Sequence, residues 1–204
     1  MSRHRLGAVL RSGVVVTVLG AGALAAVPAG AKGASYVTVK ELVSASTFVK
    51  KLNETVVSPT GKFVGRINSN TGAIRGKLTL PASATTVKLL GIGVARATIG
   101  IAPTKPVTGK VNFSTFTITT TSTFNLQVRS LAPAGTSVNL VGSHCQTATP
   151  ITLTLTGPFQ AIGSSTYTGS FTIPPFTNCQ GLALVLTEQA SGPGNTFTGT
   201  FAPA

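Results

Sequence analysis

Short runs of alternating apolar and polar residues, separated by turn residues, constrain the fold of this chain more than any other feature. Val, Ile, Phe and Thr dominate the runs, and Gly, Pro and Asn recur between them. These residue types favour strands, and a period of two buries one face of each strand. No stretch combines a period of 3.6 residues with helix caps. The sequence predicts an all-β fold, an antiparallel β-sandwich or alternatively a closed β-barrel, of about 8–10 strands.

The clearest hairpin covers residues 62–80. Its first strand carries Phe63 and Ile67 on one face, its return strand carries Ile74 and Leu78, and the turn is the segment 69–72. Both apolar sets share a face only if Ile67 lies opposite Ile74, which requires a loop of two or four residues. Further strands are expected at 87–95, 97–101, 107–113, 115–128, 151–156, 165–173, 182–188 and 195–201.

The N-terminal part of the chain has the pattern of an export signal. Basic residues up to Arg11 precede an uncharged apolar stretch at 12–27, and small residues then lead to an expected cleavage between Ala31 and Lys32. A transmembrane anchor is the alternative, but the stretch is short for a bilayer of about 30 Å. We expect a secreted, extracellular protein, either free or loosely associated with the cell wall, without a transmembrane segment in the mature chain.

The expected domain organisation follows from this cleavage site. Residues 1–31 form the signal peptide, 32–58 an N-terminal strand or arm, and 59–204 a single all-β domain. Within the second segment, residues 36–52 mix apolar side chains with Lys40, Glu41 and Lys50, so a helix is conceivable. The β-branched content makes a strand at least as good an interpretation, and a loosely ordered arm is a third.

Cys145 and Cys179 are the two cysteines of the chain. An even number of cysteines in an exported chain favours a disulfide, and two buried free thiols are the alternative. Together with His144 they cannot complete a four-ligand zinc site, so we expect no metal.

Carboxylates are scarce: Glu41, Glu54 and Glu188 are the three acidic residues, and Asp is absent. Most acid–base and metal chemistry needs carboxylates, His and Cys acting together. The segment 143–145 contains Ser, His and Cys, but adjacent strand residues point to opposite faces and no Asp can orient the His. We therefore expect no enzyme, no cofactor and no catalytic residues, and glutamates that pair with basic residues.

The basic residues greatly outnumber the acidic ones, with a net charge of +13. In the predicted hairpin Arg66 opposes Arg75 on the outward face, beside Lys62 and Lys77. Like charges directly opposite each other are destabilising, so these four residues are a candidate anion-binding face. The alternative is a solvated face whose side chains splay apart. Nucleic acid is not expected as a partner, because aromatic residues are few and Trp is absent.

Several turn and cysteine motifs occur along the chain: GRINSNTG at 65–72, GSHCQT at 142–147, YTG at 167–169, PPFTNC at 174–179 and SGPGNT at 191–196. In this order they resemble the motifs of a family of uncharacterised exported proteins of high-GC Gram-positive bacteria (actinobacteria). The resemblance implies secretion, an all-β fold and a Cys145–Cys179 bridge, and it implies no activity.

Two classes of function remain from the sequence. The first is a secreted or envelope-associated protein, binding or structural, that engages an anionic cell-envelope polymer, a polysaccharide or another surface protein. The second is a carrier of an apolar ligand or lipid inside a β-barrel or sandwich cavity. The apolar segment 89–94 would line such a cavity or form an oligomer interface. An oligomeric pore is a third possibility, since alternating strands also build membrane barrels, but the expected strands are short for it.

Overall fold

The computed structural model describes residue 33 and residues 35–204, apart from 90–92 and 161. The expected signal peptide and its cleavage site between Ala31 and Lys32 lie outside the described residues. The chain divides into Met1–Gly33 and Ala34–Ala204, and the second unit carries the elements described here. They are β1 (Tyr36–Val49), β2 (Glu54–Asn68), β3 (Ala73–Thr79), β4 (Ser83–Leu89), β5 (Gly93–Pro103), β6 (Val107–Asn112), β7 (Thr117–Pro133), β8 (Gln146–Thr147), β9 (Ile151–Pro158), β10 (Ser165–Ile173), β11 (Phe176–Thr177), α1 (Ala183–Ala190) and β12 (Gly192–Pro203).

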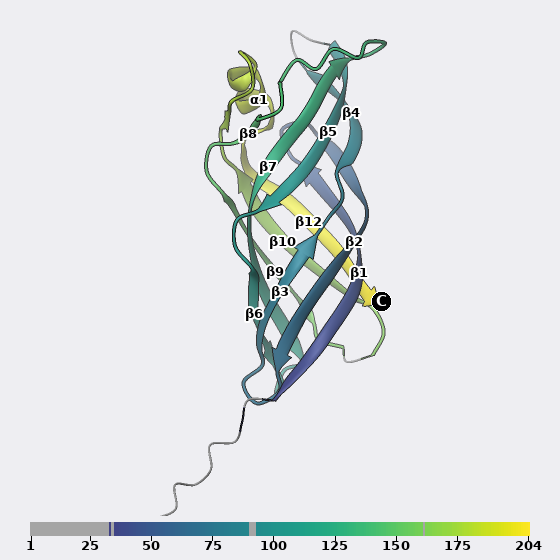
Figure 1. Cartoon of the computed structure of the whole chain (residues 1–204), viewed down its shortest axis with the longest axis vertical. Helices are drawn as coiled ribbons and strands as arrows, with labels where there is room; N and C mark the ends of the chain where they lie inside the picture. The colour runs from purple at the N-terminus through teal and green to yellow at the C-terminus, as the bar shows by residue number, and fades with distance from the viewer. Residues whose placement is uncertain (1–32, 34, 90–92, 161) are drawn as a thin grey trace, which may run out of the picture. The chain divides into compact units, whose positions relative to one another are not determined.

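Eight of these strands form a closed antiparallel barrel (Figure 1). Their order around the barrel is β1, β2, β3, β6, β7, β9, β10 and β12, and β12 pairs back onto β1. The order follows the chain, so the barrel is an up-and-down meander with insertions. The all-β expectation is confirmed, and of the two architectures that the sequence left open the structure has the barrel. Closure leaves these strands no free edge along their paired lengths.

The remaining elements extend the barrel beyond one end. β7 is long enough for two partnerships: residues 117–124 pair with β9 inside the barrel, whereas residues 124–133 pair with β5. β4 pairs with β5, and the short strands β8 and β11 pair beside the second half of β7. Figure 1 shows α1 and the β4–β5 hairpin toward this end, and the start of β1 at the opposite end.

The β2–β3 hairpin has the register that the sequence predicts. Ile67 lies opposite Ile74, and residues 69–72 form the four-residue loop. The Asn68 side-chain oxygen accepts hydrogen bonds from the backbone N–H groups of Asn70 and Thr71, at 2.9 and 3.0 Å. Gly72 closes the turn at a φ of 73°, in the left-handed region that glycine adopts at little cost.

Residues 36–52 form a strand for most of their length. β1 pairs with β2 from Tyr36 to Val49 and with β12 from Glu41 to Phe48. A register shift between Val43 and Ala45 marks a β-bulge, which bends the strand around the barrel.

The strand expected at 182–188 is wrong, because this segment belongs to helix α1. Asn178, Gln180 and Gly181 all have positive φ, so the chain turns sharply before the helix. A helix satisfies the backbone hydrogen bonds of this segment locally. Leu186 and Ala190, four residues apart, are its buried positions, and this spacing is a helical signal that Val185 and Thr187 obscured.

The single strand expected at 87–95 is also wrong. β4 ends at Leu89 and β5 begins at Gly93, antiparallel to it. Gly93 has a φ of 79°, which a continuous strand does not accommodate. The strand expected at 115–128 is in contrast longer than predicted, since β7 continues to Pro133.

Glycines that face the barrel interior make room for aromatic rings. A Cβ added to Gly76 would lie 2.6 Å from the Phe63 ring, and one added to Gly65 would lie 2.7 Å from the same ring. Gly157 has the same relation to Tyr167 at 2.5 Å. Each ring therefore packs against the backbone of a nearby glycine, where no side chain competes for the space. This is how large residues fit inside an eight-stranded barrel.

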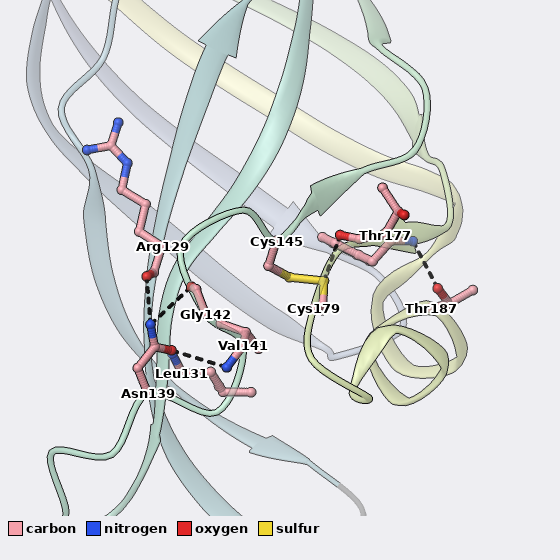
Figure 2. The surroundings of a disulfide bond; sticks show 10 residues. Arg129, Leu131, Asn139, Val141, Gly142, Cys145, Thr177, Cys179 and Thr187 are labelled. Atoms are coloured by element: carbon pink, nitrogen blue, oxygen red, sulfur yellow. Dashed lines mark hydrogen bonds between the residues drawn. A yellow bond between two sulfur atoms is a disulfide. The ribbon is translucent and has the colours of Figure 1, made fainter.

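The expected disulfide between Cys145 and Cys179 is present (Figure 2). It joins the segment before β8 to the turn before α1, and both cysteines are buried.

Asn139 fixes the same region, because its side chain bridges the end of β7 and the following loop. Its hydrogen-bond partners are the N–H groups of Leu131 and Val141 and the carbonyl oxygens of Arg129 and Gly142.

Candidate functional site

A cavity of about 450 Å³ occupies the half of the barrel in which β1 begins. Its lining comes from all eight barrel strands and is largely apolar. Phe63, Ile74 and Leu78 lie on β2 and β3, and Leu155 and Phe201 lie across the barrel on β9 and β12. The other half of the barrel holds a space of only about 80 Å³, because large apolar side chains fill it.

The cavity exists because many inward positions around it carry small side chains. Gly109 lies on β6 where a Cβ would meet the Thr119 carbonyl oxygen, so no side chain projects from this position. On β7 the inward residues are Thr120 and Ser122, which are shorter than the Phe124 that follows them. The sequence change from small to large along β7 thus marks the floor of the cavity.

Three aromatic rings form one wall of the cavity. Tyr167 on β10 and Phe201 on β12 meet edge to face with their centroids 5.0 Å apart. Phe201 meets Phe63 on β2 in the same way at 6.3 Å. Edge-to-face contacts of this kind stabilise the pairs by about 0.5–1.5 kcal/mol beyond the area they bury, so this wall is fixed in the absence of ligand.

Glu41 brings a carboxyl group into this apolar surrounding. It lies on β1 between Val39 and Val43, on the strand face that points into the barrel, and it lines the cavity. Its register partner on β2 is Phe63, and its partner on β12 is Pro203. The carboxyl group therefore lies beside the aromatic wall, with apolar neighbours on both adjacent strands.

The apolar surrounding changes the acidity of the polar groups in the cavity. Burial raises the pKa of the Glu41 carboxyl above its ordinary value of 4.5. Burial also raises the pKa of Tyr167; a hydrogen bond with Ser165 lowers this pKa, and the charge of Glu41 raises it further. The charge of Glu41 thus acts on Tyr167, and both residues line the cavity. Burial is the cause of the Glu41 shift, and no cation among the described residues contributes to it, so the structure does not support the expectation that Glu41 pairs with a basic residue.

The cavity reaches the end of the barrel. Its lining includes Phe113 in the β6–β7 turn, and Phe159, Gln160 and Gly163 between β9 and β10. Gln160 and Gly163 are exposed, whereas the ring of Phe159 is held edge to face against Phe113 at 6.2 Å. A ligand would enter the barrel between these two connections and the start of β1.

The predicted basic face is brought together on the outer wall. Arg66 lies opposite Arg75, and Lys77 lies opposite Val64. Lys62 is the outward residue of β2 next to Val64. All four basic side chains are exposed. The neighbouring strands add two cations that sequence reasoning did not include: Lys40, opposite Val64 on β1, and Lys110, opposite Ala73 on β6.

The other candidate positions do not form a site. His144 is exposed beside the disulfide, and within the described part of the chain no three His, Cys, Asp or Glu side chains gather where a metal could bind. In the apolar segment 89–94, Leu89 is buried and Val94 is exposed, while 90–92 lie outside the described residues. None of the helices among the described residues has the length and hydropathy to cross a membrane.

The fold and cavity together define an eight-stranded antiparallel barrel with an apolar interior that opens at one end. Comparisons with protein families, with curated proteins and with solved structures found no match to this chain.

Sequence reasoning missed the inward position of Glu41. The signal was available in the alternation of β1, where Val39, Glu41 and Val43 share one face. Recognising it required knowing that residues 36–52 form a strand and which of its faces is buried. Tyr167 was noted only as part of a turn motif, although its alternation with Ser165 and Phe171 predicts that it faces inward.

Proposed function

We propose that this protein is a non-enzymatic carrier that binds one apolar ligand inside the barrel. The observation that supports this proposal best is the cavity of about 450 Å³, walled by Phe63, Tyr167 and Phe201. Small-molecule sites typically have about 300–1,000 Å³ and a mainly apolar lining with few polar groups. The cavity meets both criteria. Burial of ligand surface would supply most of the affinity, at about 25 cal/mol per Å².

The polar groups of the cavity favour a ligand with a hydrogen-bond donor at one end. The Glu41 carboxyl is the acidic group on the cavity wall, and Tyr167 senses its charge. An amine or hydroxyl group can donate to this carboxyl group, and an amine also offsets its charge. A ligand carboxylate would instead meet a like charge in apolar surroundings. We therefore infer a chain-like or ring-like apolar molecule with an amine or hydroxyl end.

Secretion is part of the same proposal. A basic and apolar leader precedes the barrel in the sequence, and the Cys145–Cys179 disulfide is typical of oxidising compartments. A carrier in such a compartment would move apolar molecules through water outside the cell.

The test is a fluorescence titration with phenylnaphthylamine, a dye that brightens in apolar surroundings. Thr120 lines the cavity, and Thr119 is the exposed residue before it on β7. The change Thr120→Phe places a ring in the cavity, whereas Thr119→Phe places the same ring on the outer wall. We expect wild type and Thr119→Phe to bind the dye equally, and Thr120→Phe to bind it at least about tenfold more weakly.

Displacement of the dye tests the ligand class. Dodecylamine and dodecanol should displace it at lower concentrations than dodecanoate, and Glu41→Gln should reduce this preference. Equal dye binding by Thr120→Phe and Thr119→Phe would show that the dye does not occupy the cavity, and the carrier proposal would then fail.

A second candidate function is retention on an anionic polymer of the cell envelope through Lys62, Arg66, Arg75 and Lys77. The observation that favours it is the direct opposition of Arg66 and Arg75, which is unfavourable unless an anion lies between or above them. Replacing all four residues by Gln should lower the salt concentration that releases the protein from purified envelope. The pair Lys88→Gln and Arg96→Gln, exposed on β4 and β5, is the control. Equal release of both variants and wild type would contradict this function.

A further inference from the structure

We propose that the open end of the barrel docks on an anionic lipid bilayer, with its apolar rim in the membrane and a belt of cations at the headgroups. This inference rests on the proposed carrier function and adds the surface from which the ligand is taken or to which it is delivered. The rim consists of Tyr36, Val37, Phe113, Phe116 and Ile162, and the belt consists of Arg66, Arg75 and Lys110.

The rim surrounds the cavity opening. Tyr36 and Val37 begin β1, Phe113 and Phe116 lie in the β6–β7 turn, and Ile162 lies in the β9–β10 connection. These side chains are exposed by 57, 55, 43, 65 and 89%, in that order. Val37 and Phe113 also line the cavity, so the apolar surface continues from the rim into the barrel. Exposed apolar patches of this kind typically mark sites of interaction.

Phe116 is held at the rim in a conformation that its residue type disfavours. Its φ of 50° lies in the left-handed region, which is uncommon for a bulky side chain. Asn112 begins the turn by accepting hydrogen bonds from the N–H groups of Ser114 and Thr115, at 3.0 and 3.3 Å. The Phe116 carbonyl oxygen accepts a further hydrogen bond from the N–H group of Phe159, at 2.7 Å. The turn thus keeps an aromatic ring in water at a backbone cost, which is a reason to look for a partner.

The cation belt lies directly behind the rim. Arg66 and Lys110 are each two residues from the end of their strands, and Arg75 is two residues from the start of its strand. At about 3.3 Å per residue, this places their backbones about 7 Å from the rim. Amphipathic segments that bind membranes insert about 5–10 Å, so the cations would reach the headgroups. Arg66 also lies over the ring of Tyr36, with 5.8 Å between guanidinium and centroid.

Among the side chains that the structure describes, no carboxylate lies beside this belt on the outer wall. Glu41 faces the cavity, Glu54 begins β2 at the opposite end of the barrel, and Glu188 lies in α1 near that same end. Each Lys or Arg near an anionic membrane contributes about 1 kcal/mol. Further cations up the wall, among them Lys40, Lys62 and Lys77, extend the positive field from the rim.

The rim favours a bilayer over a water-soluble polyanion as the partner. A polyanion would engage the cations and leave the five apolar side chains in water. A bilayer accepts both, because its interior takes the apolar side chains and its anionic headgroups take the cations. Docked in this way, the cavity opens toward the hydrocarbon, and an apolar ligand passes between bilayer and barrel without crossing water.

The test is cosedimentation of the exported protein with vesicles, without added ligand. Vesicles of phosphatidylglycerol and phosphatidylcholine are compared with vesicles of phosphatidylcholine alone. Phe116→Asn removes the ring and relieves the backbone, because Asn tolerates a positive φ. Leu184→Asn is its control, since Leu184 is exposed by 75% on α1 toward the opposite end. Arg66→Gln with Arg75→Gln removes two of the three belt cations, and Lys88→Gln with Arg96→Gln, exposed on β4 and β5, is the control.

We expect Phe116→Asn to weaken binding to anionic vesicles about tenfold, and the arginine pair to weaken it by at least as much, while both controls bind like wild type. Equal binding by Phe116→Asn, Leu184→Asn and wild type would overturn the docking proposal, and loss only in the arginine pair would assign the wall to a polyanion. Dye binding without vesicles tests the carrier function separately, because none of the residues altered in these variants lines the cavity. Val37 and Phe113, which belong to both the rim and the cavity lining, are left unchanged.

Discussion

At the scale of single residues, the proposed ligand class depends on the position of the Glu41 carboxyl group. The chain has three glutamates, and Glu41 is the one that faces an apolar cavity. A half-buried carboxyl in apolar surroundings lowers stability when it is charged, and perturbed groups of this kind are candidates for a function. A donor group on a bound ligand would compensate for this loss.

The pH dependence of stability follows from the raised pKa of Glu41. Well below pH 4.5 the Glu41 carboxyl is protonated in the folded and the unfolded chain alike. As the pH rises from 4.5 through the raised pKa, the unfolded chain loses its proton first, so the free energy of unfolding of the wild type falls. Glu41→Gln cannot lose a proton and escapes this fall. Urea unfolding should therefore show the variant more stable than wild type at neutral pH, with the difference closing in acid.

Glu54→Gln, at an exposed position on β2, is the matched control for this measurement. A constant difference between Glu41→Gln and wild type at every pH would mean that Glu41 is not desolvated. The composition alone gave the opposite expectation for this residue, a surface ion pair. Only the phase of Glu41 within β1, beside Val39 and Val43, contains the information that it points inward.

At the scale of elements, local patterns were predictable and context-dependent ones were not. The β2–β3 hairpin was predicted to its register, because Ile67 and Ile74 bury only when they oppose each other. The strand at 165–173 matches β10 at both ends. Helix α1 was missed because its β-branched residues Val185 and Thr187 favour a strand, although Leu186 and Ala190 have the spacing of buried helical positions. The turn at Gly93 was missed because its positive φ is invisible in an apolar run.

The disulfide stabilises the elements beside the second half of β7, where it joins the segment before β8 to the turn before α1. Cys145 and Cys179 close a loop of 34 residues, which constrains the unfolded chain by about 3–4 kcal/mol. We expect Cys145→Ala with Cys179→Ala to lower the free energy of unfolding by about that amount, measured by urea unfolding followed by circular dichroism. Dye binding should persist under native conditions, because neither cysteine lines the cavity. A loss below about 1 kcal/mol would show that Asn139 and the surrounding packing already fix this region.

At the scale of the whole molecule, closure of the barrel was the step that the sequence left open. It depends on the pairings of β1 with β12 and of β7 with β9, and the first of these joins the two ends of the domain. Alternating strands serve a sandwich and a barrel equally well, so periodicity cannot decide between them. The cavity is likewise a property of the closed barrel, since Phe63, Tyr167 and Phe201 meet only across strands distant in sequence.

The barrel has three surfaces of different chemistry, the interior, the outer wall at β2 and β3, and the rim, and each lies at a different place on the molecule. The interior is apolar with Glu41, the outer wall at β2 and β3 is basic, and the rim between them is apolar again. The proposed carrier and docking functions are tested at different residues, because Thr120 lines the cavity whereas Phe116, Arg66 and Arg75 lie outside its lining. Variants of one function should therefore leave the other intact.

The most direct measurement for the central claim is a crystal structure of the protein with dodecylamine that carries bromine at the end of its chain. The anomalous signal of bromine locates the chain end without reference to the model of the protein. We expect one bromine peak inside the barrel, near Leu78, Ser122 and Leu155, with the amine toward Glu41. A barrel interior without bromine, with peaks only on the outer wall, would contradict the carrier function.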